Sequence, residues 1–288
     1  MTKRYHKPNT NRRETLMIPG ALKRIAEAHN NGEMSEAIKP AFDKLTLDAE
    51  IALDMPFHSV MDKETVPPSG SKHDYMSLSI YTWPDPNTPD GLPYRIVDGV
   101  VNPGVEKFDH PNMVRMLSAV DTLSSAYCIT GDERYSKKAA DLIKFWFLNP
   151  ETGMNPNMLF AQYIPGNGYF DIPSSYYPVF VPGNSHGGVY VSFGGVIEGA
   201  IFPVLLESIE LIRGSKFWTD EDHRGLQEWF RKFLYWLLES QHGKDEASTK
   251  NNHGSWYCTQ VAAYAIFSNE LDIARRILTK NVPERVAM

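Results

Sequence analysis

Apolar residues recur in this chain at the spacing of an α-helix. In one segment they follow Leu226 at intervals of 3, 4, 7, 8 and 11 residues: Trp229, Phe230, Phe233, Leu234 and Leu237. The same spacing runs through residues 116–127 and 139–147. Between these two segments lies the polar stretch TGDERY, residues 130–135, whose glycine indicates a tight turn. The pattern therefore predicts an antiparallel helical hairpin, a basic unit of all-α folds.

Five more segments show helical periodicity, and two long segments interrupt it. The additional helices are expected at about residues 20–30, 36–54, 196–213, 254–267 and 269–280. The interrupting segments, 56–111 and 149–193, are rich in proline or glycine and also in aromatic residues. Loops of this length in a compact domain are usually functional. We expect them to be the ordered walls of a cleft.

The expected fold is all-α: an incomplete (α/α) toroid or barrel of helical hairpins, with long ordered loops lining the cleft. No repeat is visible in the sequence itself. We expect residues 1–288 to form one domain, with residues 1–20 disordered. A chain of 288 residues is long enough to bury a large core.

Composition excludes several classes of partner. The chain is 42% hydrophobic and 22% charged, as in ordinary soluble globular proteins. Its net charge of −6 argues against binding to nucleic acid or to an anionic membrane surface. No uninterrupted apolar run is long enough to predict a membrane span. An acidic ligand would need a local basic or hydrogen-bonding site.

The cysteines and the N-terminus leave alternatives open. Cys128 and Cys258 lie in helix-like segments without metal-ligand spacing, which favours buried free thiols over a single disulfide. The basic N-terminus lacks the apolar segment of a signal peptide. Either the protein is intracellular, or a signal peptide has been removed from it.

Polar and aromatic residues gather in five short motifs outside the apolar stripes. These motifs are SGSKHDYMS (69–77), YTWPDP (81–86), MNPNMLFAQYIPG (154–166), GNSHGGVY (183–190) and KNNHGSWYCTQ (250–260). Aromatic faces next to hydrogen-bonding groups suit a sugar acid, whose ring offers apolar C–H patches and a carboxylate. The alternatives are a solvated charged loop at 69–77 and simple helix capping by the asparagines of the last motif.

Other chemistries have weaker support. Three histidines are candidates for a metal site: His73, His186 and His253. None has a partner at HxH or HExxH spacing, so we predict no metal. The motifs typical of serine hydrolases and nucleotide-binding loops are absent. A glycoside hydrolase needs paired carboxylates, and Asp74, Asp171 and Glu198 are possible members, but their spacing selects no pair.

Several separated motifs, in the same order, resemble the alginate lyase superfamily of polysaccharide lyases: SGSKHDYMSLSIYTWPDP, DGLPY, VNP, MNPNMLFAQ and NNHGSW. The resemblance extends from about residue 35 to the end, and it is closest to the branch acting on alginate and glucuronan. It implies an incomplete α/α toroid, no cofactor, an acidic polysaccharide as substrate and a periplasmic or secreted location. One departure is Ser71, where family members usually carry aspartate.

The resemblance implies β-elimination across C4 and C5 of a 1,4-linked uronate. The C5 proton is weakly acidic because the adjacent carboxylate is already negative, so the enzyme must neutralise that carboxylate and supply a base. Asn252 would be the neutraliser, since its amide donates without titrating. His253 would be the base or a second neutraliser. Asn251 is then the expected helix cap.

The expected substrate-binding residues are Lys72, His73, Tyr75, Tyr81, Trp83, Gln162, Tyr163 and His186. Gln162 matches a substrate-contacting glutamine of the family. Lys72, His73 and Tyr75 match a loop on the opposite wall, and the aromatic pair of YTWPDP would stack on neighbouring sugars. His186 lies between glycines, from where it could move over a cleft. Trp256 is expected in the core.

The catalytic acid is missing from the matched motifs. In the family, an arginine that helps neutralise the carboxylate and a tyrosine that serves as acid follow the Asn-His pair at a distance that this chain, ending at Met288, does not reach. We therefore expect that the C-terminal part of the family domain is absent. Either Tyr75, Tyr163 or Tyr257 replaces the acid, or catalysis is lost. The other functions considered are a non-catalytic protein that binds acidic polysaccharide and an inverting glycoside hydrolase.

Overall fold

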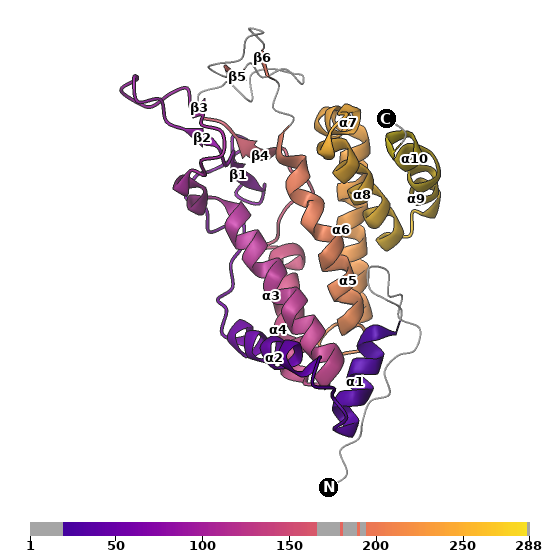
Figure 1. Cartoon of the computed structure of the whole chain (residues 1–288). Helices are drawn as coiled ribbons and strands as arrows, with labels where there is room; N and C mark the ends of the chain where they lie inside the picture. Colours follow the sequence, from indigo (N-terminus) through magenta and orange to yellow (C-terminus); the bar gives the residue numbers. More distant parts are fainter. Residues whose placement is uncertain (1–19, 166–178, 181–188, 191–193, 287–288) are drawn as a thin grey trace.

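Helices make up most of the structure, a computed structural model that describes residues 20–165, 179–180, 189–190 and 194–286 (Figure 1). In chain order the helices are α1 (Ala21–Asn31), α2 (Lys39–Leu53), α3 (Asp109–Thr130), α4 (Glu133–Ile143), α5 (Phe202–Ile212), α6 (Asp220–Glu239), α7 (Gln241–Ser248), α8 (Asn252–Phe267), α9 (Leu271–Arg276) and α10 (Val282–Val286). Two 3₁₀ segments, Pro103–Lys107 and Gly194–Ile201, precede α3 and α5. Two π-helical turns, Lys144–Leu148 and Ile277–Asn281, extend α4 and α9.

The predicted hairpin is confirmed by α3 and α4. Gly131 ends α3 in the left-handed conformation, with φ at 70°, which glycine adopts without a steric penalty. Asp132 then begins α4, because its side chain accepts a hydrogen bond from the backbone N–H of Arg134. A left-handed residue followed at once by a capping side chain reverses the chain within two residues.

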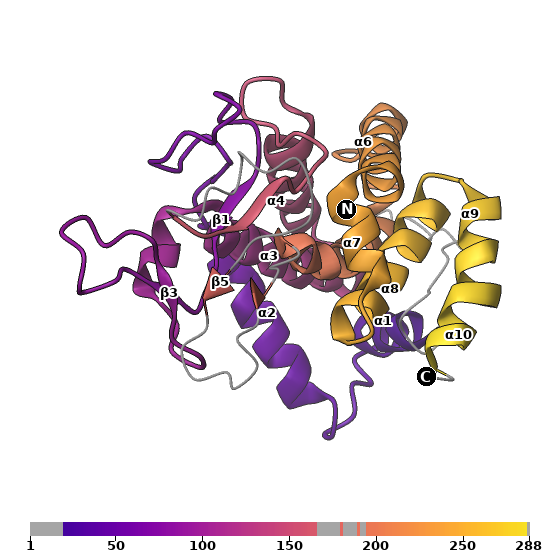
Figure 2. The same ribbon diagram turned by 90° about the horizontal axis from the view of Figure 1, so that it is seen from above.

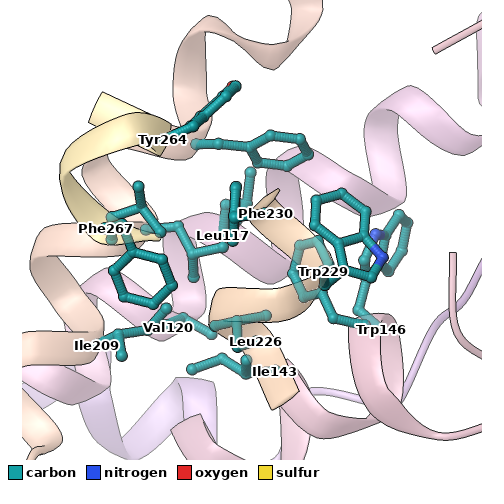
Figure 3. Packing of buried hydrophobic residues seen from close by; sticks show 14 of the residues in the cluster. Leu117, Val120, Ile143, Trp146, Ile209, Leu226, Trp229, Phe230, Tyr264 and Phe267 are labelled. Atoms are coloured by element: carbon teal, nitrogen blue, oxygen red, sulfur yellow. The ribbon is translucent and has the colours of Figure 1, made fainter. Parts of the chain in front are cut away.

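The core lies where α3, α4, α5, α6 and α8 meet (Figure 3). All six apolar residues of the stripe on α6 are buried, as the periodicity predicted. The ring of Trp229 meets that of Phe147 edge-on at 4.8 Å, and the ring of Phe230 lies 5.2 Å from that of Tyr264. Edge-to-face and tilted contacts of this kind add to the burial of aromatic area. They hold α6 against α4 and α8.

Three pairs of short strands lie at one end of the helices, within segments expected to be irregular (Figure 1). The strands are β1 (Met76–Leu78), β2 (Thr82–Trp83), β3 (Arg95–Ile96), β4 (Phe160–Tyr163), β5 (Val179–Phe180) and β6 (Val189–Tyr190). β1 pairs with β4 in parallel, β2 with β3 and β5 with β6 antiparallel. The first pair places the motif at 69–77 beside the motif at 154–166. The sequence did not predict these strands, because the segments are short and their hydrophobicity does not alternate.

Two expectations for single elements were wrong. Residues 196–213 do not form one α-helix, because the chain is 3₁₀ through Ile201 and α5 begins with Pro203 in its first turn. Proline has no N–H to donate, so it fits the start of a helix. Trp256 is not in the core: it is 42% exposed, since the buried side of α8 passes through its neighbours Tyr257 and Val261 instead.

The whole is the incomplete (α/α) toroid expected from the sequence. Seen from above, α3 and α4 lie towards one side and α9 and α10 lie on the other, outside α8 (Figure 2). Within the described ranges, no helix has the length and apolar character needed to cross a membrane. Cys128 and Cys258 are not joined by the disulfide that the sequence left open.

Candidate active site

The junction between α7 and α8 presents Asn252 and His253. Asn251 is the cap of α8, as predicted: its side chain accepts a hydrogen bond from the N–H of His253 at 3.1 Å. Asn252 is exposed in the first turn. The capping and functional interpretations of the motif are therefore compatible, because they concern different asparagines.

His253 pairs with a buried carboxylate that the sequence analysis did not single out. Its Nδ1 lies 2.9 Å from Oε1 of Glu246 on α7, and the His253 side chain is 29% exposed whereas that of Glu246 is 0% exposed. With Nδ1 occupied, Nε2 is the ring nitrogen left to exchange a proton with a ligand. The only sequence signal for this pair was a separation of seven residues, which is uninformative across a helix break.

Electrostatics favour the charged form of this imidazole. The hydrogen bond that His253 donates to Glu246 raises the pKa of His253 above its ordinary value, and burial opposes this less strongly. Burial raises the pKa of Glu246, while His253 acts to lower it. Oε2 of Glu246 is buried without a hydrogen-bond partner in the described part of the chain. Among the described residues, His253 is thus the hydrogen-bond partner of the Glu246 carboxylate.

A fully buried ion pair fixes the SGSKHDYMS motif. Nζ of Lys63 lies 3.0 Å from Oδ2 of Asp109, and the two side chains are 0% and 1% exposed. Lys63 also donates to the carbonyl oxygens of Val60 and Lys72, and Asp109 accepts from the N–H of Met76 at 2.8 Å. Burial raises the pKa of Asp109 to about 7 against the opposing charge of Lys63. This pair pins residues 72–76 to the start of α3.

A second buried network joins β1, α3 and the 3₁₀ segment Gly194–Ile201. Oε2 of Glu198 accepts hydrogen bonds from the hydroxyls of Tyr75 and Ser77, each at 2.7 Å. The Tyr75 proton is used there, so the Nδ1 of His110, 3.1 Å from the tyrosine oxygen, is the donor in that contact. Tyr75 is 0% exposed, and burial raises its pKa well above the ordinary value. Its side chain therefore offers no surface to a ligand.

Gln162 is held in a strained conformation at the end of this network. Its φ is 52°, a left-handed value that is uncommon outside glycine, and its N–H donates to the hydroxyl of Ser77 at 2.7 Å. Gly195 lies directly against it, since a Cβ there would approach Cγ of Gln162 to 2.6 Å. Strained backbone of this kind persists only where the surroundings fix it, and it concentrates at functional sites.

The 3₁₀ segment Gly194–Ile201 connects Gln162 to α8. Gly195 contacts Gln162, and four residues later the carbonyl oxygen of Gly199 accepts a hydrogen bond from the hydroxyl of Tyr264 at 2.7 Å. A Cβ at Gly199 would lie 2.4 Å from Oε1 of Gln260, so only glycine allows this approach. This one short segment therefore contacts both Gln162 and α8.

Ser77→Ala should lower the free energy of unfolding by about 1–3 kcal/mol, because it leaves the Gln162 N–H without a partner and removes one of the two hydroxyl hydrogen bonds to Glu198. Denaturant unfolding of the purified variant measures this change. Ser124→Ala is the matched control: Ser124 is equally buried, and its hydroxyl has no hydrogen-bond partner among the residues that the structure describes. Equal effects of the two substitutions would contradict the importance of the Ser77 hydrogen bonds.

The remaining expected substrate-binding residues belong to other elements than α7 and α8. Nζ of Lys72 donates to the carbonyl of Met61 at 3.3 Å. Nε1 of Trp83 donates to the carbonyl of Val100 at 2.8 Å, and Tyr81 is exposed. Tyr163 on β4 is half-buried, and burial raises its pKa. His186 lies outside the described residues.

His73 lines a cavity of about 360 Å³ between α6 and the loop that follows α4. Its Nδ1 lies 2.7 Å from the carbonyl oxygen of Gly153. Asn155, Trp229 and Lys232 also line this cavity. The structure thus turns His73 and Tyr75 in different directions, although they are two residues apart.

Two of the three carboxylates considered for a hydrolase, Asp74 and Glu198, are engaged in hydrogen bonds within the described residues. Oδ1 of Asp74 accepts hydrogen bonds from Asn155 at 2.8 Å and Asn157 at 3.1 Å. Burial acts to raise the pKa of Asp74, but these hydrogen bonds and one from Ser69 hold it below its usual value. Asp171 lies outside the described residues. Within the described ranges, no group of histidine, cysteine and acidic side chains could hold a metal ion.

Comparison with known proteins decides the family. A family model described as alginate lyase matches residues 59–286. The chain belongs to the alginate lyase family. Among solved structures, a crystal structure of an alginate lyase from Bacteroides ovatus matches with a TM-score of 0.80 and 36% sequence identity. The match covers 92% of this alginate lyase family member and 63% of that chain, so the chain spans less than two thirds of its relative's length. Among curated proteins no sequence matches.

Proposed function

We propose that this chain is a polysaccharide lyase that cleaves 1,4-linked uronate polymers, such as alginate or glucuronan, by β-elimination. The observation that carries the proposal is the pair of Glu246 and His253 beside Asn252, at the start of α8, in a member of the alginate lyase family. An acidic polysaccharide is the expected partner, and the family resemblance favours a periplasmic or secreted location.

The start of α8 suits a uronate carboxylate. The first N–H groups of a helix are not bonded within it and carry partial positive charge, so an anion is stabilised there. Asn252 lies in this first turn, is exposed, and has an amide that can donate without a change in charge. Neutralising the carboxylate in this way makes the adjacent C5 proton more acidic.

His253 is the proposed base at C5. The hydrogen bond to Glu246 holds the ring through Nδ1, so Nε2 is the nitrogen that would accept the proton. A raised pKa makes the imidazole a stronger base, and the neutral ring needed for abstraction is populated as pH rises through that pKa. Turnover should therefore increase with pH on the acid side of the profile.

Tyr163 is the best placed of the three tyrosines considered as the acid. Tyr75 is fully buried, and Tyr257 is buried with its hydroxyl donating to the carbonyl of Leu237 at 3.3 Å. Tyr163 retains exposed surface and lies next to Gln162 on β4. Burial raises its pKa, which keeps the hydroxyl protonated and able to donate to the leaving O4.

An assay of reaction products tests the function. The purified chain is incubated with alginate, with glucuronan and with a neutral glucan, and both ultraviolet absorbance and reducing ends are followed. A lyase produces an unsaturated uronate that absorbs in the ultraviolet, and we expect this from a uronate polymer but not from the neutral glucan. New reducing ends without absorbance would indicate a hydrolase, and binding without either product would indicate a carbohydrate-binding protein. Both results would contradict the proposal.

A further inference from the structure

Arg285 reaches from α10 to the junction of α7 and α8. Its Nη1 donates to the carbonyl oxygen of Thr249 at 2.7 Å, its Nη2 donates to that of Ala247, and its Nε contacts Sγ of Cys258 at 3.2 Å. Both Figure 1 and Figure 2 show α10 beside α8. One guanidinium thus contacts the end of α7 and the beginning of α8.

The guanidinium of Arg285 lies in the space that a side chain at position 254 would fill. A Cβ at Gly254 would lie 2.1 Å from Nη1 of Arg285, so the arginine fits only because residue 254 is glycine. Gly254 directly follows His253, and Ala247 directly follows Glu246. Arg285 therefore contacts the neighbour of each member of the Glu246–His253 pair.

The chemistry of arginine fits this position. The carbonyl oxygens near the end of α7 have no partners within the helix and carry partial negative charge, which a cation stabilises. A planar guanidinium offers several donors in fixed directions and can bond two carbonyls at once, whereas lysine acts as a point charge. A substitution that keeps the charge therefore separates the two contributions.

We infer that Arg285 is a positioning residue: by bonding to the backbone at the junction of α7 and α8, it keeps Glu246 and His253 at a fixed separation. It acts through the backbone of α7 and α8 and does not touch the substrate. Its importance for catalysis rests on the proposed role of His253, whereas its effect on the geometry of the pair does not.

The test is an NMR titration of the His253 ring in the full chain. In the unsubstituted chain the pKa should lie above the ordinary value, and Glu246→Gln should return it towards that value as a reference. Arg285→Ala should lower the pKa of His253 in the same direction, because the carboxylate and the ring lose their fixed separation. Arg285→Lys should give an intermediate shift. Arg275→Ala is the control, since Arg275 is exposed on α9 and pairs with Asp272.

Kinetics with a uronate polymer separate positioning from stability. Arg285→Ala should lower kcat by up to about a hundredfold, the scale expected when reacting groups are misplaced by an ångström. If that variant does not fold, Arg285→Lys carries the test. An unchanged pKa of His253 in a folded Arg285 variant would overturn the inference, even if kcat fell. A lowered pKa in a chain without lyase activity would support the inference and count against the proposed function.

Discussion

His253→Ala should reduce the turnover of a uronate polymer by at least about a hundredfold, the scale of a lost general base. The substitution removes the only part of the Glu246–His253 pair that reaches the surface, because Glu246 is 0% exposed. Alanine cannot accept the C5 proton, so kcat should fall more than KM rises. The measurement is initial velocity, followed as unsaturated product, over a range of substrate concentrations.

The matched control is His58→Ala. His58 also pairs with a carboxylate, its Nδ1 lying 3.0 Å from Oδ2 of Asp62, but it lies far along the chain from α7 and α8. Its removal should leave kcat unchanged. Near-normal turnover of His253→Ala would assign the base to another residue, and an equal loss in both variants would point to a general effect on folding.

Lys63→Met should lower the free energy of unfolding by about 3–5 kcal/mol, the usual cost of removing one partner of a buried ion pair. The substitution leaves Asp109 as a buried carboxyl whose Oδ1 already has no hydrogen-bond partner in the described part of the chain. It also removes the donor to the carbonyls of Val60 and Lys72. Denaturant unfolding monitored by circular dichroism measures the loss.

Lys107→Met is the control for this substitution. Lys107 forms an ion pair with Glu64 at 3.5 Å, but both side chains are mostly exposed, so solvent already screens their attraction. Its loss should change stability little. If Lys63→Met cost no more than Lys107→Met, the buried pair would contribute nothing to holding residues 72–76 on α3.

The local features of this fold were predictable from short stretches of sequence. The turn at Gly131, the buried stripe on α6 and the cap at Asn251 each depend on residues within a few positions of one another. Helical periodicity and capping are properties of adjacent turns, so they can be read without knowing the rest of the molecule. Trp256 shows the limit, because its neighbours are apolar but its own direction on α8 is outward.

The contacts within the site depended on packing between distant segments. Lys63 meets Asp109, and Tyr75 meets Glu198, across long stretches of chain. From the sequence, Tyr75 and His73 are equally good candidates to bind a ligand. Only the tertiary structure buries the first and leaves the second at a cavity.

By itself, the sequence determined the all-α class, the hairpins, the family and the place of Asn252 and His253 at the start of a helix. The tertiary structure alone decided the contacts of the candidate site residues. Glu246 pairs with His253, and Arg285 bonds to the backbone at the junction of α7 and α8. Ser77 and Gly195 contact Gln162. The physical reason is the distance along the chain between the residues that interact. Helix formation is driven by interactions between residues three and four apart, whereas the partner of a buried charge is chosen by how whole elements pack.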